Sequence, residues 1–310
     1  MKQRYIVLAC DAAPTYAIYL PLVVRLWRRL GYKALVYLHA EGWDTPFGDL
    51  VRAELALAGS TTSIIDAVAP LGIANTMRCA RLVAACEPFL DPEDFLLTSD
   101  VDMIPLSRTF FDRREDFIVY RGLGDIWMQP AAPVPPRPPA VMRPGEVRFP
   151  MCYSGATAEI WRYMLPLNYG IPHDALVDTI APYLPSRTNY TDLDETIGSY
   201  AFLAHPRAQG VVEEVSTGVW RQGDLYLVDP IDAPQLTPHE HMHRGLLLLA
   251  DGWIPGRGDP PSAPIDFIPC RFYPGERPWW CFDVPAIYFP EEAAWITSYV
   301  ERAKVAIGSW

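Results

Sequence analysis

The sequence predicts an α/β fold in which a mixed, mainly parallel sheet is flanked by helices within one extended domain. The chain has 310 residues, and half of them are hydrophobic, which is enough to bury a large core. Its first hundred residues alternate between short β-rich runs and amphipathic helical stretches. This alternation is typical of parallel strands joined by crossover helices.

The expected elements follow one another along the chain. In the first hundred residues we expect strands at 5–10, 33–39, 61–66 and 95–99, with helices at 16–30, 46–57 and 73–89. Further strands are expected at 116–121 and 149–157, and further helices from Ala158, after Asp192 and at 290–307. In open sheets of this kind ligands bind beyond the carboxyl ends of the strands, where Asp11, His39 and Asp100 lie.

A proline-rich stretch divides this domain into two halves. Residues 1–122 form the first half, and residues 149–310 form the second half with the final helix. Residues 123–148 contain QPAAPVPPRPPAVMRPGEV, in which neither a helix nor a strand can form. A lid over a site and a passive linker are both consistent with such a loop.

The composition excludes several classes of partner. Because 26 basic residues face 37 acidic ones, we do not expect broad binding to nucleic acid or to anionic lipid. The six cysteines are scattered and contain no C-x-x-C pair, which indicates buried thiols and a reducing cytoplasm. No apolar run is long enough for a transmembrane segment. Peripheral membrane contact stays open.

An acidic pair follows an apolar strand in the stretch DFLLTSDVDMIPL. Asp100 and Asp102 are separated by one residue, so in an extended chain they point the same way. Two converging carboxylates raise each other's pKa unless a cation compensates them. Hard oxygen ligands suit Mn²⁺ or Mg²⁺. We therefore expect a metal site at Asp100 and Asp102; the alternative is a pair that caps a turn or lies exposed.

The segment TSDVDMIPL resembles the D-x-D segment of the GT-A glycosyltransferases, and the resemblance extends with gaps over most of the chain. In motif order it is closest to the group of glycogenin and the lipopolysaccharide galactosyltransferases. The resemblance implies a GT-A fold and a metal-dependent transfer of sugar. The donor would be a nucleoside diphosphate sugar of UDP or GDP type. The acceptor would be a hydroxyl of a carbohydrate-like molecule, a lipid-linked glycan or a protein.

The same resemblance implies a set of donor-binding residues. They follow the first strand, lie on the helix before the acidic pair, belong to the pair itself, or lie in MCYSGATAEIW and FYPGERPWW. These residues are Ala9, Cys10, Asp11, Tyr16, Arg78, Arg81, Asp100, Val101, Ser154, Gly155 and Arg277. The residues alone allow a simpler interpretation. Arg78 and Arg81 are then ordinary solvated arginines of a helix, and Gly155 is needed only for steric reasons.

Two acidic residues open a predicted helix in NYTDLDETIGSYAFL. Asp192 can cap this helix, and its first turn then carries Asp194 and Glu195. Acidic residues are expected there for the helix dipole alone. The resemblance implies that an acidic motif at this place touches the donor sugar or the acceptor, and that a carboxylate acts as general base in inverting members. Asp194 and Glu195 are therefore the catalytic candidates, with Asp194 preferred.

A histidine cluster offers a third metal ligand. The stretch HEHMHR at 239–244 holds three of only six histidines, which favours metal ligation. The resembled group completes its cation site with a late histidine, but here Phe272 stands near that position. We expect His243, or otherwise His241, to replace it, and Arg277 to neutralise the leaving diphosphate.

Three other classes of protein compete with this interpretation. A zinc peptidase is suggested because His239, Glu240 and His243 satisfy H-E-x-x-H, although Pro238 places His239 in the opening turn of any helix. A nucleotidyltransferase would need a glycine-rich loop after the first strand, which CDAAPTY lacks. The third class is a non-catalytic sugar-binding relative.

Overall fold

The computed structural model describes most of the first hundred residues and selected segments beyond them. The described residues are 2–105, 117–119, 151, 154–165, 167–186, 190, 193–204, 267–269, 282, 285–286 and 288–308.

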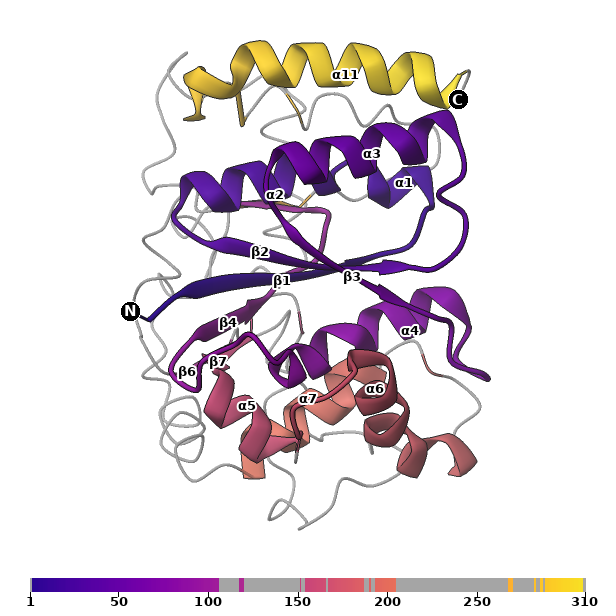
Figure 1. Ribbon diagram of the computed structural model, residues 1–310, viewed down its shortest axis with the longest axis vertical. Helices are drawn as coiled ribbons and strands as arrows, with labels where there is room; N and C mark the ends of the chain where they lie inside the picture. The colour runs from indigo at the N-terminus through magenta and orange to yellow at the C-terminus, as the bar shows by residue number, and fades with distance from the viewer. Residues whose placement is uncertain are drawn as a thin grey trace, which may run out of the picture.

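A six-stranded sheet in the order β3-β2-β1-β4-β7-β6 forms the centre of the fold (Figure 1). The first four strands of this order are parallel, whereas β7 runs antiparallel to both β4 and β6. The predicted α/β class with a mixed, mainly parallel sheet is therefore confirmed. The strands are β1 (Arg4–Cys10), β2 (Lys33–His39), β3 (Thr61–Ile65), β4 (Phe95–Thr98), β6 (Phe117–Val119) and β7 (Ser154–Thr157).

The order of the strands places a topological switch point, where open α/β sheets have their ligand crevice, between the carboxyl ends of β1 and β4. From β1 the chain proceeds to β2 and β3 on one side, and β4 then returns to the other side of β1. Ligands bind at such topological switch points. The backbone N–H of Ser99 still donates to the carbonyl of Val7, at 3.0 Å, so the chain after β4 continues beside the end of β1.

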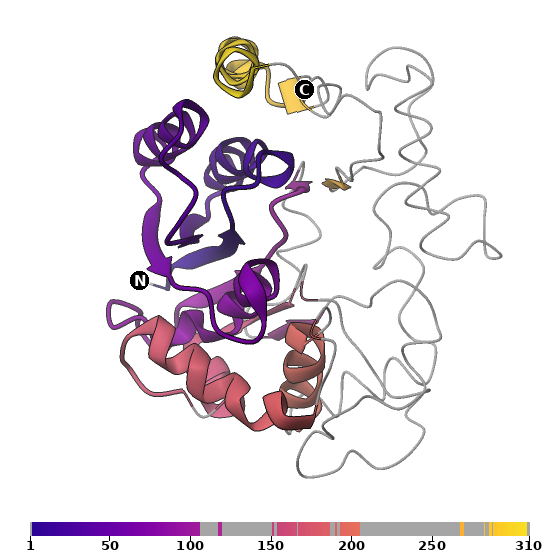
Figure 2. The ribbon, with the colours of Figure 1, turned by 90° about the vertical axis from the view of Figure 1, so that its right-hand side faces the viewer.

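Helices cover both faces of the sheet (Figure 2). Ile6, Leu8 and Cys10 of β1 point to one core, and Tyr5 and Val7 point to the other, as expected for alternating side chains. The first core is covered by α1 (Pro14–Ala17), α2 (Leu20–Arg29), α3 (Pro46–Leu57) and α11 (Ala293–Ile307). The second is covered by α4 (Gly72–Ala80), the 3₁₀ helix η1 (Arg81–Cys86), α5 (Ala158–Met164), α6 (Pro172–Ile180), the 3₁₀ helix η3 (Ala181–Ser186) and α7 (Leu193–Ala204).

The observed helices differ from the prediction in three places. The helix expected at 16–30 is two helices, because Pro21 lies in the opening turn of α2, where its missing N–H is tolerated. The stretch expected at 73–89 is α4 followed by η1. Helix α6 was not predicted.

The C-terminal helix α11 is held on α2 and α3 by buried polar groups, which confirms that the final helix packs on the body. Glu54 of α3 accepts hydrogen bonds from the Trp295 indole at 2.8 Å and from Arg302 at 2.7 Å. The Tyr299 hydroxyl donates to the carbonyl of Ile18 at 2.8 Å. Glu292, in the 3₁₀ turn η5 (Pro290–Glu292) before α11, binds arginines of α2.

A small second sheet and three thiols complete the described structure. Strand β5 (Met103–Pro105) pairs antiparallel with β8 (Phe267–Pro269). Among the described residues, Cys10, Cys79 and Cys86 are buried and form no disulfide, as predicted for them. None of the described helices has the length and apolar character needed to cross a membrane.

Candidate functional site

The predicted acidic pair lies in a turn at the switch point between β1 and β4. The expectation of an extended chain through Asp100 and Asp102 is wrong, because the N–H of Met103 donates to the carbonyl of Asp100 at 3.3 Å and closes a turn. Aspartate is favoured at the first position of such turns. Val101 is buried, whereas the two aspartates are only partly buried. Both carboxylates therefore stay accessible.

A single buried arginine joins the acidic turn to α7. Arg81 is only 5% exposed. One of its terminal nitrogens binds Asp100 and the carbonyl of Met151, the latter at 3.2 Å, and the other binds Asp194 at 2.9 Å. Its Nε donates to the carbonyl of Arg78 at 3.3 Å. The guanidinium thus donates to four protein groups, and its two terminal nitrogens hold Asp100 and Asp194.

Asp194 lies in the first turn of α7 and is almost fully buried. Burial raises the pKa of its carboxyl group, Arg81 opposes this effect, and Asp100 adds to it. The helix can approach this closely because Gly198 faces Met151; a Cβ at Gly198 would lie 2.4 Å from the Met151 sulfur. A buried carboxylate with a raised pKa and one fixed cation is suited to proton transfer.

The end of β1 brings further predicted residues to the same crevice. Asp11 accepts a hydrogen bond from the N–H of Ala13 at 3.0 Å, at the start of α1. Burial raises the pKa of the Cys10 thiol, and the charges of Asp11 and Asp102 raise it further. Asp102 therefore lies near the end of β1. Asp11 and Asp102 thus lie near Cys10 at the end of β1, and Arg81 joins Asp100 to Asp194.

The residues predicted on β7 have clear packing roles. The hydroxyl of Thr98 donates to the carbonyl of Ser154 at 3.0 Å and accepts from its N–H at 3.1 Å. A Cβ at Gly155 would lie 2.6 Å from the ring of Phe95. The steric reason considered for Gly155 is thus present, and its source is a neighbouring strand rather than a strand-to-helix turn. A role in donor binding stays a prediction for both residues.

Some of the other predicted residues are described by the structure, and the rest lie outside the described residues. Arg78 lies on α4, and its charge lowers the pKa of Asp194; Glu195 follows Asp194 on α7. Ala9 is partly buried, and Tyr16 is about half exposed on α1. The predictions for His241, His243, Arg277, the 239–243 motif and the proline-rich loop lie outside the described residues.

Sequence reasoning missed two contributors to this site. Met151 offers its carbonyl to Arg81, and Gly198 permits the close packing of α7. A glycine inside an amphipathic helix is the only signal that points to such a contact, since it is unfavourable there without a packing reason. Met151 contacts Arg81 through its backbone carbonyl, which every residue type has, so the sequence does not reveal this contact.

The acidic turn suits a hard divalent cation that is also bound by a substrate. Within the described part of the chain, no three His, Cys, Asp or Glu side chains gather closely enough to enclose a metal. Mg²⁺ commonly binds through one or two carboxylates and completes its shell with substrate phosphates and water. Asp100 and Asp102 fit that pattern, with Arg81 holding one oxygen of Asp100.

No protein-family model and no curated protein matches the sequence. The chain is similar to the solved galactosyltransferase LgtC with donor and acceptor sugar analogues, at 15% identity over 99% of this chain and 97% of that chain, with a TM-score of 0.44. An active-site mutant of LgtC gives 19% identity over 63% and 70%, with a TM-score of 0.40. The apo glycosyltransferase GlyE from Streptococcus pneumoniae TIGR4 gives 17% identity over 65% of this chain and 43% of that chain, with a TM-score of 0.33. These likenesses are distant, and the function is inferred from the residues of the site.

Proposed function

We propose that this protein is a metal-dependent glycosyltransferase that moves a sugar from a nucleoside diphosphate sugar to a hydroxyl acceptor. The observation that carries the proposal is the bridge from Asp100 through Arg81 to Asp194 at the β1/β4 switch point. It ties an acidic turn that suits a diphosphate-bound cation to a buried carboxylate that suits a hydroxyl acceptor. In a metal-dependent inverting transfer, the cation would stabilise the leaving diphosphate and the carboxylate would accept the proton of the hydroxyl.

In this proposal Asp100 and Asp102 hold Mn²⁺ or Mg²⁺. The bound cation would neutralise the charge that develops on the departing diphosphate. Arg81 orients Asp100 through a charge-assisted hydrogen bond. Ala9 and Cys10 end β1 and Asp11 follows them, and we place the nucleotide beside these residues.

Asp194 is the residue that we assign to the acceptor side. Its buried carboxylate is fixed by Arg81 and has a raised pKa, which brings it closer to the range in which a carboxylate accepts a proton efficiently. Glu195 is less buried and is the second candidate for contact with the sugar or the acceptor. Arg78 would add positive charge beside the donor.

The proposal is tested by incubating the protein with Mn²⁺ and a panel of UDP- and GDP-sugars, with and without sugar acceptors, and measuring the release of nucleoside diphosphate. We expect release with at least one donor, and its loss in Asp102→Asn. Asp178→Asn, on the exposed surface of α6, is the matched control and should retain activity. No release with any donor, together with zinc-dependent cleavage of peptides, would replace this proposal by the H-E-x-x-H peptidase.

A further inference from the structure

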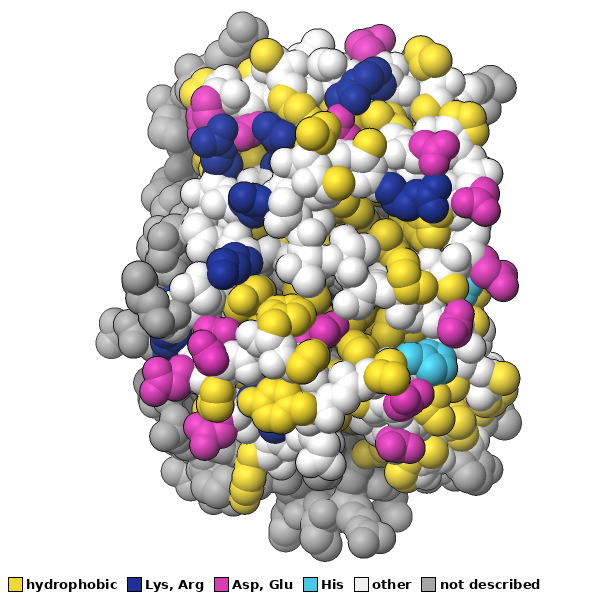
Figure 3. Space-filling model, in the orientation of Figure 1, with side chains coloured by type: hydrophobic (Ala, Val, Ile, Leu, Met, Phe, Trp, Pro, Cys, Tyr) yellow, Lys and Arg dark blue, Asp and Glu magenta, His cyan; other side chains and the backbone are white. Residues whose placement is uncertain are grey.

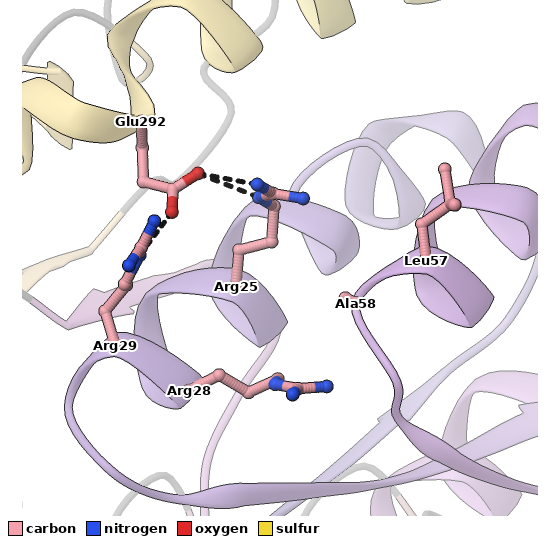
Figure 4. A pocket seen from close by; sticks show the side chains of 6 residues that line it. All are labelled: Arg25, Arg28, Arg29, Leu57, Ala58 and Glu292. Atoms are coloured by element: carbon pink, nitrogen blue, oxygen red, sulfur yellow. Dashed lines mark hydrogen bonds and ion pairs between the residues drawn. The ribbon is translucent and has the colours of Figure 1, made fainter.

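A hollow of about 270 Å³ lies between α2, α3 and the turn before α11 (Figure 4). We call it the arginine hollow. It is lined by Arg25, Arg28, Arg29, Leu57, Ala58 and Glu292.

The arginine hollow lies at the opposite edge of the sheet from the acidic crevice. It is formed by the C-terminal ends of α2 and α3, which lead into the first residues of β2 and β3. The crevice lies at the other, carboxyl ends of the strands. Because β1 spans seven residues, the two edges are separated by roughly 23 Å, at about 3.3 Å per residue. The hollow is therefore no extension of the proposed donor site.

The charges around the hollow do not balance. Glu292 is buried and binds both Arg25, at 2.8 Å, and Arg29. The half-exposed Glu291 lies 4.0 Å from Arg29. Among the described residues, no carboxylate pairs with Arg28. Three guanidinium groups thus line a space to which a single carboxylate contributes, on a chain whose overall charge is −11.

Arg28 is exposed, and its side chain lines the hollow. Figure 4 shows it extended toward Ala58, while Arg25 and Arg29 turn toward Glu292. The guanidinium occupies the space left by Gly59, where a Cβ would lie 2.3 Å from an Arg28 terminal nitrogen. Gly59 has a φ of +67°, which already favours glycine. In Figure 3 most Lys and Arg side chains on this face gather in its upper half, where α2, α3 and α11 lie.

We propose that the arginine hollow binds a phosphate-class anion, either a soluble phosphate monoester or the phosphate of a lipid headgroup. Guanidinium groups present paired N–H donors that match phosphate oxygens. Arg28 supplies the uncompensated charge, and Arg25 and Arg29 keep N–H groups on the side away from Glu292 because each guanidinium has five donors. Leu57 and Ala58 form an apolar side of the hollow for the carbon part of the ligand.

The first arm of the test uses inorganic phosphate and no divalent cation, so that the acidic crevice does not contribute. The full chain is titrated at constant ionic strength while the phosphorus NMR line width is measured. We expect saturable broadening that Arg28→Gln weakens about tenfold in affinity, the loss of a charge-assisted contact. Arg52→Gln, a partly exposed arginine on α3 that pairs with Asp49, is the control and should bind as the wild type does.

The second arm identifies the source of the phosphate by sedimenting the protein with phosphatidylcholine vesicles, with and without phosphatidic acid. Sedimentation that needs phosphatidic acid and Arg28 assigns the hollow to a lipid headgroup. Phosphate binding without sedimentation assigns it to a soluble monoester. The proposal is overturned if the protein binds in neither arm, or if Arg28→Gln leaves binding unchanged. Arg25 and Arg29 would then serve only to hold the turn before α11 through Glu292.

Discussion

The two edges of the sheet carry charge clusters of opposite design. At the carboxyl edge, the buried Arg81 is shared by two carboxylates, Asp100 and Asp194. At the amino edge, the buried Glu292 is shared by two guanidinium groups, Arg25 and Arg29. In each cluster the buried central charge contacts two groups of opposite charge, and such contacts offset the cost of burying it.

The surplus charge of each cluster resides on its more exposed members. The side chain of Asp100 is 42% exposed and that of Arg29 is 48% exposed, whereas Arg81 and Glu292 are buried. The carboxyl edge thus presents negative charge to solvent, and the amino edge presents positive charge. This difference in charge agrees with our two proposals, a cation site at one edge and an anion site at the other.

The largest effect is expected when the centre of the carboxyl-edge cluster is removed. Arg81→Met leaves Asp194 buried without its cation and should lower the free energy of unfolding by about 4 kcal/mol, the cost of breaking a buried pair. Urea unfolding measures this loss. Arg81→Lys keeps the charge but loses the fork that spans both carboxylates, so it should be more stable than Arg81→Met and still lose activity. A loss below about 1 kcal/mol for Arg81→Met would break the comparison.

The next effect concerns the role of Asp194 at the same edge. Asp194→Asn should lower kcat about 100-fold or more, as expected when a general base is lost. Because burial raises the pKa of Asp194, kcat/KM of the wild type should fall on the acid side at a pH above the usual value of 3.8 for aspartate. The pH profile of nucleoside diphosphate release measures both. An Asp194→Asn enzyme with the acid limb of the wild type would exclude this role.

The centre of the amino-edge cluster gives a smaller effect with a defined pH dependence. Glu292→Gln should cost about 2 kcal/mol at neutral pH, because hydrogen bonds to a charged group are lost. The two arginines lower the pKa of Glu292 below its usual value of 4.5 in spite of its burial. Its stabilising effect is therefore complete above pH 4.5 and is lost as the pH falls through the lowered pKa. The difference between wild type and variant should shrink in that range.

The control for this variant is Glu291→Gln, because the Glu291 side chain is half exposed and its nearest nitrogen on Arg29 is 4.0 Å away. It should change the free energy of unfolding by less than about 0.5 kcal/mol. Equal losses in the two variants would mean that Glu292 is not the centre of the cluster.

The smallest effect on stability is expected for Tyr299, which holds α11 by a neutral hydrogen bond, whereas Glu292 holds it by charged contacts. Tyr299→Phe removes the hydrogen bond to the carbonyl of Ile18 and should cost about 1 kcal/mol at all pH values. Thermal unfolding at neutral and acid pH measures it. A loss that disappears in acid, as for Glu292→Gln, would show that the two anchors are not independent.

Much of the sheet could be predicted because its strands carry local signals. The apolar runs that became β1, β2 and β4 are short and bounded by polar residues. The range of α3 was also predicted, from its amphipathic pattern. In the structure Thr45 caps this helix by accepting a hydrogen bond from Gly48. Helix α6 was missed, although Pro172 at its first position and Asp174 in its first turn are typical of a helix start.

The site was predictable only in part, for a physical reason. Asp100 and Asp102 could be found because two carboxylates directly after a buried strand are costly without a partner. The partner of Asp194 could not be found, because Arg81 is 113 residues away in sequence and meets it only through the packing of α7. That packing depends on Gly198 fitting against Met151, which no local pattern encodes.

The central claim is that the carboxyl edge binds a divalent cation through Asp100 and Asp102, and Mn²⁺ binding tests it most directly. Free Mn²⁺ is followed by electron paramagnetic resonance while protein is added in the presence of UDP or GDP. The account predicts that wild-type protein and Asp178→Asn remove Mn²⁺ from solution equally, and that Asp102→Asn binds it at least about tenfold more weakly. Equal Mn²⁺ binding by Asp102→Asn and wild type would contradict it.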